Sequence, residues 1–144
     1  MLKALSITGF LGMAGGVIAQ FATGNLFSSS PWVISVQVGA AVLLLWARVA
    51  FGRRSFHLAA NPTEGGLVTS GPYRYIRHPI YTAFGVFCGA GVVAHWSWVS
   101  GLLGAAVVGG ALLRISCEEV MVTVRYPEYR QYAATTWRMI PYLF

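Results

Sequence analysis

Charged residues are scarce in this 144-residue chain, which contains no aspartate and only four glutamates. They make up 10% of the residues, against about 25% in ordinary soluble domains, whereas hydrophobic residues make up 56%. This composition excludes an intrinsically disordered chain and is typical of an integral membrane protein. The length suits one domain, and we expect a single membrane domain over residues 1–144.

Cysteine is also rare: Cys88 and Cys117 both lie in apolar stretches, where a thiol behaves as a small hydrophobic group. A disulfide-rich secreted fold is therefore excluded. The sequence shows neither a nucleophilic triad nor a set of metal ligands, so we expect no metal site.

Ten lysines and arginines give a net charge of +6, which in a soluble protein would suggest binding to nucleic acid. Their distribution indicates a membrane instead. One stretch of 44 residues, between Lys3 and Arg48, and another of 36, ending before Arg114, contain no charged side chain. Each is long enough for two helices that cross a hydrocarbon layer of about 30 Å. We expect no nucleic-acid partner.

Each uncharged stretch has an internal break that locates a turn. Residues 23–31 collect turn-forming side chains and end at a proline that suits the first turn of a helix. Residues 95–98 form a polar and aromatic corner typical of a membrane interface. The breaks predict four transmembrane helices, at about 4–23, 31–51, 79–95 and 98–122. Glycine pairs spaced four apart predict close packing of helices within the bundle: Gly12 with Gly16, and Gly85 with Gly89.

Four crossings place Lys3, residues 48–78 and everything after Arg114 on one side of the membrane. All ten basic residues then share that side, which the positive-inside rule identifies as the cytoplasm. We therefore expect an integral membrane protein with both termini and its polar connections in the cytoplasm.

Two of the cytoplasmic segments are too polar for simple connectors. In the first, residues 65–81, glycines and a proline hold the backbone in non-helical shapes whose N–H and C=O groups can meet a small ligand. His78 precedes Pro79, so a histidine is predicted at the entrance of the third helix. The alternative is that Arg74, Arg77 and His78 are interfacial anchors within a belt of tyrosines.

The second segment is the end of the fourth helix. Starting near Trp98, that helix reaches Arg114 after about 24 Å, still within a hydrocarbon core of about 30 Å. Arg114 and Glu118 are four residues apart and share a helical face. A charge pair at this depth indicates a functional site, and the alternative is a structural ion pair with a snorkelling arginine.

Beyond this helix, Pro127 suits a helix start, and aromatic and apolar residues recur at helical spacing up to Ile140. The pattern predicts an amphipathic helix at about 127–140 that lies on the membrane, with Arg125, Arg130 and Arg138 toward the lipid headgroups. The predicted fold is thus an all-α integral membrane protein with four transmembrane helices and a C-terminal amphipathic interfacial helix.

Several ordered motifs in the second half of the chain resemble one known family. They are Leu67–Tyr73, Arg77–Tyr81, the pair Glu118–Glu119, and a tail with Tyr129, Tyr132, Arg138 and Pro141. The set closely resembles the isoprenylcysteine carboxyl methyltransferase family and its phospholipid methyltransferase relatives. The resemblance implies a membrane enzyme that uses S-adenosyl-L-methionine, a cofactor made in the cytosol, at a site facing the cytoplasm.

Carried over residue by residue, the family's substrate-side arginine falls on Arg114, which would bind the acceptor and serve in catalysis. Glu119 can exchange roles with Glu118 and is a second catalytic candidate, as a base. Where the family commonly has Phe-Gly before its tyrosine-rich helix, this chain has Tyr126–Pro127. The resemblance places the cofactor contacts on Gly65, Gly66, Leu67, Val68, Tyr73, His78, Pro79, Ile80, Tyr81 and Glu118.

Methyl transfer from a sulfonium is an in-line displacement for which the protein mainly supplies position. An arginine can clamp an acidic acceptor, whereas an amine requires a base, for which Glu119 and His78 are available. We expect the acceptor to be a lipid or a lipophilic small molecule. An isoprenylcysteine-type carboxylate, a lipid amine and a thiol all remain open.

Two other functions compete with this one. An NADPH-dependent membrane reductase of the steroid-reductase type has similar C-terminal helices, but the sequence shows no extra set of basic residues for the 2′-phosphate. A non-enzymatic small membrane protein would use the polar clusters only as anchors.

The predicted topology places Ser29 and Ser97 on the side opposite the cytoplasm. In a variant lacking Cys88 and Cys117, a cysteine at either position should react with a membrane-impermeant maleimide added outside intact cells. A control cysteine replacing Gln131 should react only after permeabilisation. Labelling of either turn from the cytoplasmic side alone would contradict the topology.

Overall fold

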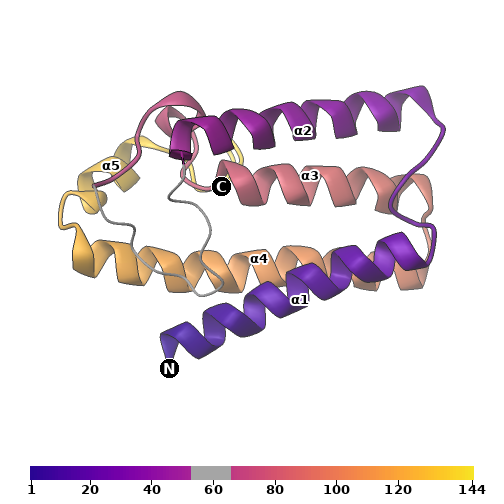
Figure 1. Cartoon of the computed structure of the whole chain (residues 1–144), viewed down its shortest axis with the longest axis horizontal. Helices are drawn as coiled ribbons and strands as arrows, with labels where there is room; N and C mark the ends of the chain where they lie inside the picture. The colour runs from indigo at the N-terminus through magenta and orange to yellow at the C-terminus, as the bar shows by residue number, and fades with distance from the viewer. Residues whose placement is uncertain (53–65) are drawn as a thin grey trace.

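The structure, a computed structural model, describes residues 1–52 and 66–144, and most of these residues are helical. Four long helices lie side by side, and a short one closes the end at which the fourth helix finishes (Figure 1). They are α1 (Leu2–Ala22), α2 (Pro31–Phe51), α3 (Pro79–Ala94), α4 (Trp98–Arg125) and α5 (Tyr129–Thr135), with a 3₁₀ turn, η2 (Gly71–Arg74), before α3. The prediction of an all-α architecture is confirmed for the described residues.

The helices begin and end close to the predicted positions because local signals set them. Pro31 and Pro79 each occupy the first turn of their helix, where the missing N–H has no helical partner to lose. Ser97 caps α4 by accepting a hydrogen bond from the backbone N–H of Ser100 (3.1 Å). The Ser100 hydroxyl in turn accepts from the Ser97 N–H (2.9 Å), which completes a reciprocal cap.

Three of these helices, α1, α2 and α4, are long and apolar enough to cross a membrane. Helix α3 is apolar but has only 16 residues, which corresponds to about 24 Å and is shorter than a hydrocarbon core of about 30 Å. The chain is therefore an all-helical protein with three candidate spans in its described part, and a fourth full span by α3 stays a prediction.

Helix α1 packs mainly on α4, and α2 packs mainly on α3. The buried face of α1 is made of Ser6, Gly9, Met13, Gly16 and Gln20, whose alternating spacings of three and four give the 3.5-residue repeat of coiled-coil packing. The two backbones come closest where Gly9 meets Gly110. A Cβ atom on Gly110 would lie 2.5 Å from the carbonyl oxygen of Gly9, so only glycine fits at this crossing.

The predicted role of the glycine pairs is partly wrong. Gly16 packs tightly, since an added Cβ would lie 2.7 Å from Val107 Cγ2. At Gly85 and Gly89, by contrast, an added Cβ would meet nothing within 4 Å among the described residues. The spacing of the glycines correctly gives a common face on each helix but does not say whether another helix covers that face.

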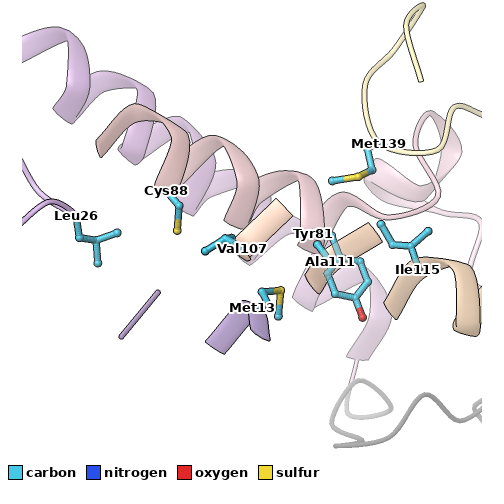
Figure 2. Packing of buried hydrophobic residues seen from close by; sticks show 8 residues of the cluster. All are labelled: Met13, Leu26, Tyr81, Cys88, Val107, Ala111, Ile115 and Met139. Carbon is cyan, nitrogen blue, oxygen red and sulfur yellow. The ribbon is translucent and has the colours of Figure 1, made fainter. Parts of the chain in front are cut away.

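A buried cluster of hydrophobic side chains joins α1, α3, α4 and the C-terminal segment (Figure 2). Tyr81 and Ile115 lie at one end of it, near the start of α3, and Met139 from the C-terminal segment covers them there. Tyr81 is thus fixed by packing while its hydroxyl stays available for polar contacts. The members of the cluster are Met13, Leu26, Tyr81, Cys88, Val107, Ala111, Ile115 and Met139.

The prediction of a long amphipathic helix over 127–140 is wrong in its extent. Helix α5 ends at Thr135, and residues after it run beside residues 75–78. The backbone N–H of Arg77 donates to the carbonyl of Trp137 (2.8 Å), and that of His78 donates to the carbonyl of Arg138 (3.1 Å). Because these carbonyls bond to a distant segment, the helical periodicity of the sequence does not continue as a helix.

The contact between Gly9 and Gly110 predicts a sharp difference between two neighbouring substitutions. Gly110→Ala should lower the free energy of unfolding by about 1–3 kcal/mol, because its methyl group would press on the backbone of α1. Gly109→Ala meets nothing within 4 Å and should be neutral or stabilising by up to about 1 kcal/mol. Unfolding in detergent micelles measures both, and equal effects would contradict the close crossing.

Candidate functional site

The start of α3, the last turns of α4, α5 and the C-terminal segment lie at the same end of the molecule (Figure 1). Polar side chains from these elements contact one another there. Two adjacent glutamates of α4, Glu118 and Glu119, are at the centre of these contacts. Because consecutive residues point about 100° apart on a helix, the two carboxylates meet different neighbours. Each organises its own set of donors.

Glu118 belongs to a compact triad with Arg114 and Tyr81. The Tyr81 hydroxyl donates to Oε1 of Glu118 (2.5 Å), and Nε of Arg114 donates both to the Tyr81 oxygen (2.6 Å) and to Oε1 of Glu118 (3.0 Å). Arg114 is 7% exposed, so this cation lies well inside the protein. The structure therefore brings together three residues that the sequence assigned to one site, and it forms the predicted pair on α4.

Glu119 is held by four donors from other parts of the chain. Its Oε1 accepts from Nε of Arg77 (3.0 Å) and the hydroxyl of Tyr129 (3.2 Å), and it lies 3.2 Å from Nε2 of His78. Its Oε2 accepts from Nη2 of Arg138 (2.7 Å). The carboxylate thus ties α4 to α5, to the start of α3 and to the C-terminal segment.

His78 lies between the two glutamates. Its Nε2 faces Glu119, while its Nδ1 lies 3.9 Å from Oε2 of Glu118, beyond hydrogen-bond distance. The ring is also 5.8 Å from the ring of Tyr81, centroid to centroid. With 9% of its surface exposed, His78 is buried at the N-cap of α3, as its position before Pro79 predicted.

Tyr73 approaches the cluster from η2. Its backbone carbonyl accepts a hydrogen bond from the Tyr132 hydroxyl (2.6 Å), and its ring packs on Phe51 of α2. Burial raises the pKa of both phenols, that of Tyr132 to about 12, and the charge of nearby Glu118 raises the pKa of Tyr73 further. Both phenols are therefore protonated at neutral pH and can donate hydrogen bonds.

A single glycine permits this approach. Gly71 has φ +60°, a left-handed conformation that favours glycine. A Cβ atom there would lie 2.9 Å from the Cβ of Ala50 and 3.2 Å from Nε1 of Trp46. Glycine thus lets the 66–74 segment pack closely on α2 and brings Tyr73 to the cluster.

The remaining predicted cofactor contacts are apolar or backbone groups. Gly66, Leu67 and Val68 are half-buried and lie outside any helix, and within the described part of the chain their backbone groups form no hydrogen bond. Pro79 is buried and Ile80 half-buried in the first turn of α3. Gly65 lies outside the described residues.

The partners of two arginines differ from those predicted from the sequence. Arg77 was considered as an interfacial anchor and Arg138 was predicted to face the lipid headgroups, but both donate to Glu119. Arg77 also donates through Nη1 to the carbonyls of Ala133 (2.8 Å) and Thr136. Glu119 lies 42 positions from Arg77 and 19 positions from Arg138 in the sequence, so no local spacing predicts these two ion pairs.

A residue from α1 also reaches the site. The ring of Phe10 lies 5.2 Å from Cζ of Arg114, measured to its centroid, in the geometry of a cation–π contact. The motifs of the sequence lie in the second half of the chain, and a single phenylalanine in an apolar run does not predict a contact with Arg114.

Among the described residues, no group of three or more His, Cys, Asp or Glu side chains is placed to hold a metal ion. Hydrogen-bond donors and carboxylates, rather than metal ligands, characterise the cluster. It combines an arginine that suits an anion, a carboxylate that suits a cation, and backbone groups beside aromatic side chains.

One protein family matches the larger part of the chain. The family, described as "Isoprenylcysteine carboxyl methyltransferase (ICMT) family", matches residues 32–124, which is well over half of the chain. The matched range contains α3 and nearly all of α2 and α4, whereas α1 and the segment after residue 124 lie outside it. No curated protein and no solved structure gives a significant match.

The four contacts of Glu119 predict that it is essential for stability. Glu119→Ala should cost about 3–5 kcal/mol, because it leaves the largely buried guanidinium group of Arg77 without its carboxylate. It also removes the partner of Arg138, whose side chain is 36% exposed and adds less to this cost. Glu128→Ala, at an exposed position that forms no capping hydrogen bond, should change stability by less than about 0.5 kcal/mol. Thermal unfolding in detergent compares the two variants, and equal midpoints would show that Glu119 does not hold the end of the bundle together.

Proposed function

Because the chain belongs to the isoprenylcysteine carboxyl methyltransferase family, we propose that it transfers a methyl group from S-adenosylmethionine to the carboxylate of a lipophilic acceptor. Membership of this family implies a membrane methyltransferase, and the long apolar helices agree with it. The observation that carries the finer proposal is the triad that the buried Arg114 and Tyr81 form with the half-buried Glu118 at one end of these helices.

The residues present fit the chemical groups of the proposed cofactor. The backbone amides of residues 66–68, which have no partner among the described residues, suit its carboxylate, and the carboxylate of Glu118 suits its ammonium group or its ribose hydroxyls. Tyr73 and Tyr81 offer aromatic faces for the adenine. When bound, the cofactor supplies an already activated methyl group, so the protein's task is to position the reactants and exclude water. Gly65, His78, Pro79 and Ile80 complete the proposed binding set.

Of the two glutamates, Glu118 is the better cofactor ligand. In the described part of the chain, both of its hydrogen bonds go to Oε1, and its Oε2 has only His78 nearby, at 3.9 Å. The oxygens of Glu119 together face two guanidinium groups, a phenol and an imidazole. We assign Glu118 to the cofactor and Glu119 to positioning.

The same contacts favour a carboxylate as the acceptor. A carboxylate is already an anionic nucleophile and needs no base, whereas an amine or a thiol must lose a proton. Glu119, the predicted base, is engaged by its four donors, and Nε2 of His78 faces that same carboxylate. Arg114 provides the positive charge that an acceptor carboxylate requires, and its burial strengthens the attraction.

The cofactor proposal is tested by isothermal titration of the purified protein with S-adenosylhomocysteine and, separately, NADPH. We expect binding of the first and none of the second. Tyr81→Phe should weaken that binding about tenfold, because it removes the hydrogen bond that orients Glu118. Tyr75→Phe, at an exposed tyrosine, is the matched control and should bind normally. Binding of NADPH alone would favour a reductase, and binding of neither ligand would favour a non-enzymatic protein.

The acceptor proposal predicts which compounds are methylated. Labelled S-adenosylmethionine should transfer its methyl group to a prenylated cysteine with a free carboxylate, and the product should be a base-labile ester. The same compound with an amidated carboxylate is the matched negative control. A base-stable product on a lipid amine or a thiol would contradict the assignment of a carboxylate.

A further inference from the structure

Helix α1 lies outside the residues that match the family, yet it forms one wall around Arg114. A Cβ atom on Gly9 would lie 3.1 Å from the backbone nitrogen of Arg114 and 3.4 Å from its Cβ. The backbone of α1 therefore touches α4 at the residue that carries the guanidinium group. One residue further along, Phe10 contacts the guanidinium group itself.

Phe10 and the polar groups use different parts of that guanidinium. The Cζ atom lies 5.2 Å from the Phe10 ring centroid, whereas Nε donates to Tyr81 and Glu118. The N–H donors of arginine lie in the guanidinium plane, and an aromatic ring interacts with its charge without accepting these hydrogen bonds in the usual sense. Contact with Phe10 therefore adds to the polar contacts and does not compete with them.

The surroundings strengthen this contact. The side chain of Arg114 is 8% exposed, and Phe10 packs against the buried hydrophobic cluster. Cation–π attraction is larger where water is excluded. The packed ring cannot swing away freely, so it restricts the long and otherwise flexible arginine side chain.

We propose that Phe10 is a positioning residue that holds the guanidinium group of Arg114 in the orientation that binds the acceptor carboxylate. The inference rests on the proposed function, because it assigns the acceptor to Arg114. It extends the acceptor side of the site to a helix outside the family match. Phe10 then acts mainly on the affinity for the acceptor, because on the cofactor side Glu118 also accepts a hydrogen bond from Tyr81, which Phe10 does not provide.

The test compares Phe10→Leu, which removes the aromatic face, with Phe10→Tyr, which keeps it. With a prenylated cysteine as acceptor, Phe10→Leu should raise KM about tenfold, and Phe10→Tyr should remain near the wild-type value. Affinity for S-adenosylhomocysteine should change much less than KM in both, because the hydrogen bond from Tyr81 still orients Glu118. Phe21→Leu, at an exposed phenylalanine of the same helix, is the control and should leave KM unchanged.

A second measurement does not depend on activity. Phenylglyoxal should modify Arg114 faster in Phe10→Leu than in the wild type or Phe10→Tyr, as followed by mass spectrometry of the peptide. An unchanged KM and an unchanged modification rate in Phe10→Leu would overturn the inference. It would also be overturned if the rise in KM came with a comparable fold-loss of cofactor affinity and a lower melting temperature, since that result indicates a general loss of structure. If the wild-type protein binds cofactor but methylates no carboxylate, the proposed acceptor fails, whereas the modification rates still decide whether Phe10 positions Arg114.

Discussion

Charge pairing at the end of α4 is the constraint on which this end of the molecule depends. Glu118 and Glu119 lie on a helix that is otherwise apolar for most of its length, and removing one partner of a buried ion pair typically costs about 3–5 kcal/mol. The donors come from α3, α4, α5 and the C-terminal segment. The elements that carry them must therefore meet here, and the same requirement that assembles the fold also concentrates polar groups in one place.

The two glutamates are adjacent in sequence but contact different neighbours. Glu119 points toward α5 and the C-terminal segment. Both of its oxygens accept hydrogen bonds, from Arg77, Tyr129 and Arg138. Glu118 points toward α3 and Arg114, and its Oε2 has fewer neighbours. With His78 between them, one carboxylate stabilises the scaffold and the other is proposed to meet the ligand.

The helix boundaries could largely be predicted from local signals in the sequence, whereas the long-range contacts of the site could not. Pro31 and Pro79 mark helix starts because proline acts within one turn, and the pairing of Arg114 with Glu118 follows from their spacing of four. The partners of Glu119 are distant in sequence and carry no periodic signature. For the same reason the periodicity after Thr135 was misleading, since the backbone there bonds to residues 75–78 instead of forming a helix. The tight crossing of Gly9 and Gly110 depends on which helices meet, which glycine spacing alone does not specify.

The central claim is that the groups around Glu118 and residues 66–81 form one binding site for S-adenosylmethionine. Hydrogen–deuterium exchange of the detergent-solubilised protein, with and without S-adenosylhomocysteine, tests this claim most directly. We expect slower exchange in the backbone of residues 66–78 and at the C-terminal end of α4, with no change in the turn at residues 23–30. Unchanged exchange in both regions at saturating ligand, or protection confined to the opposite end of the bundle, would contradict the account.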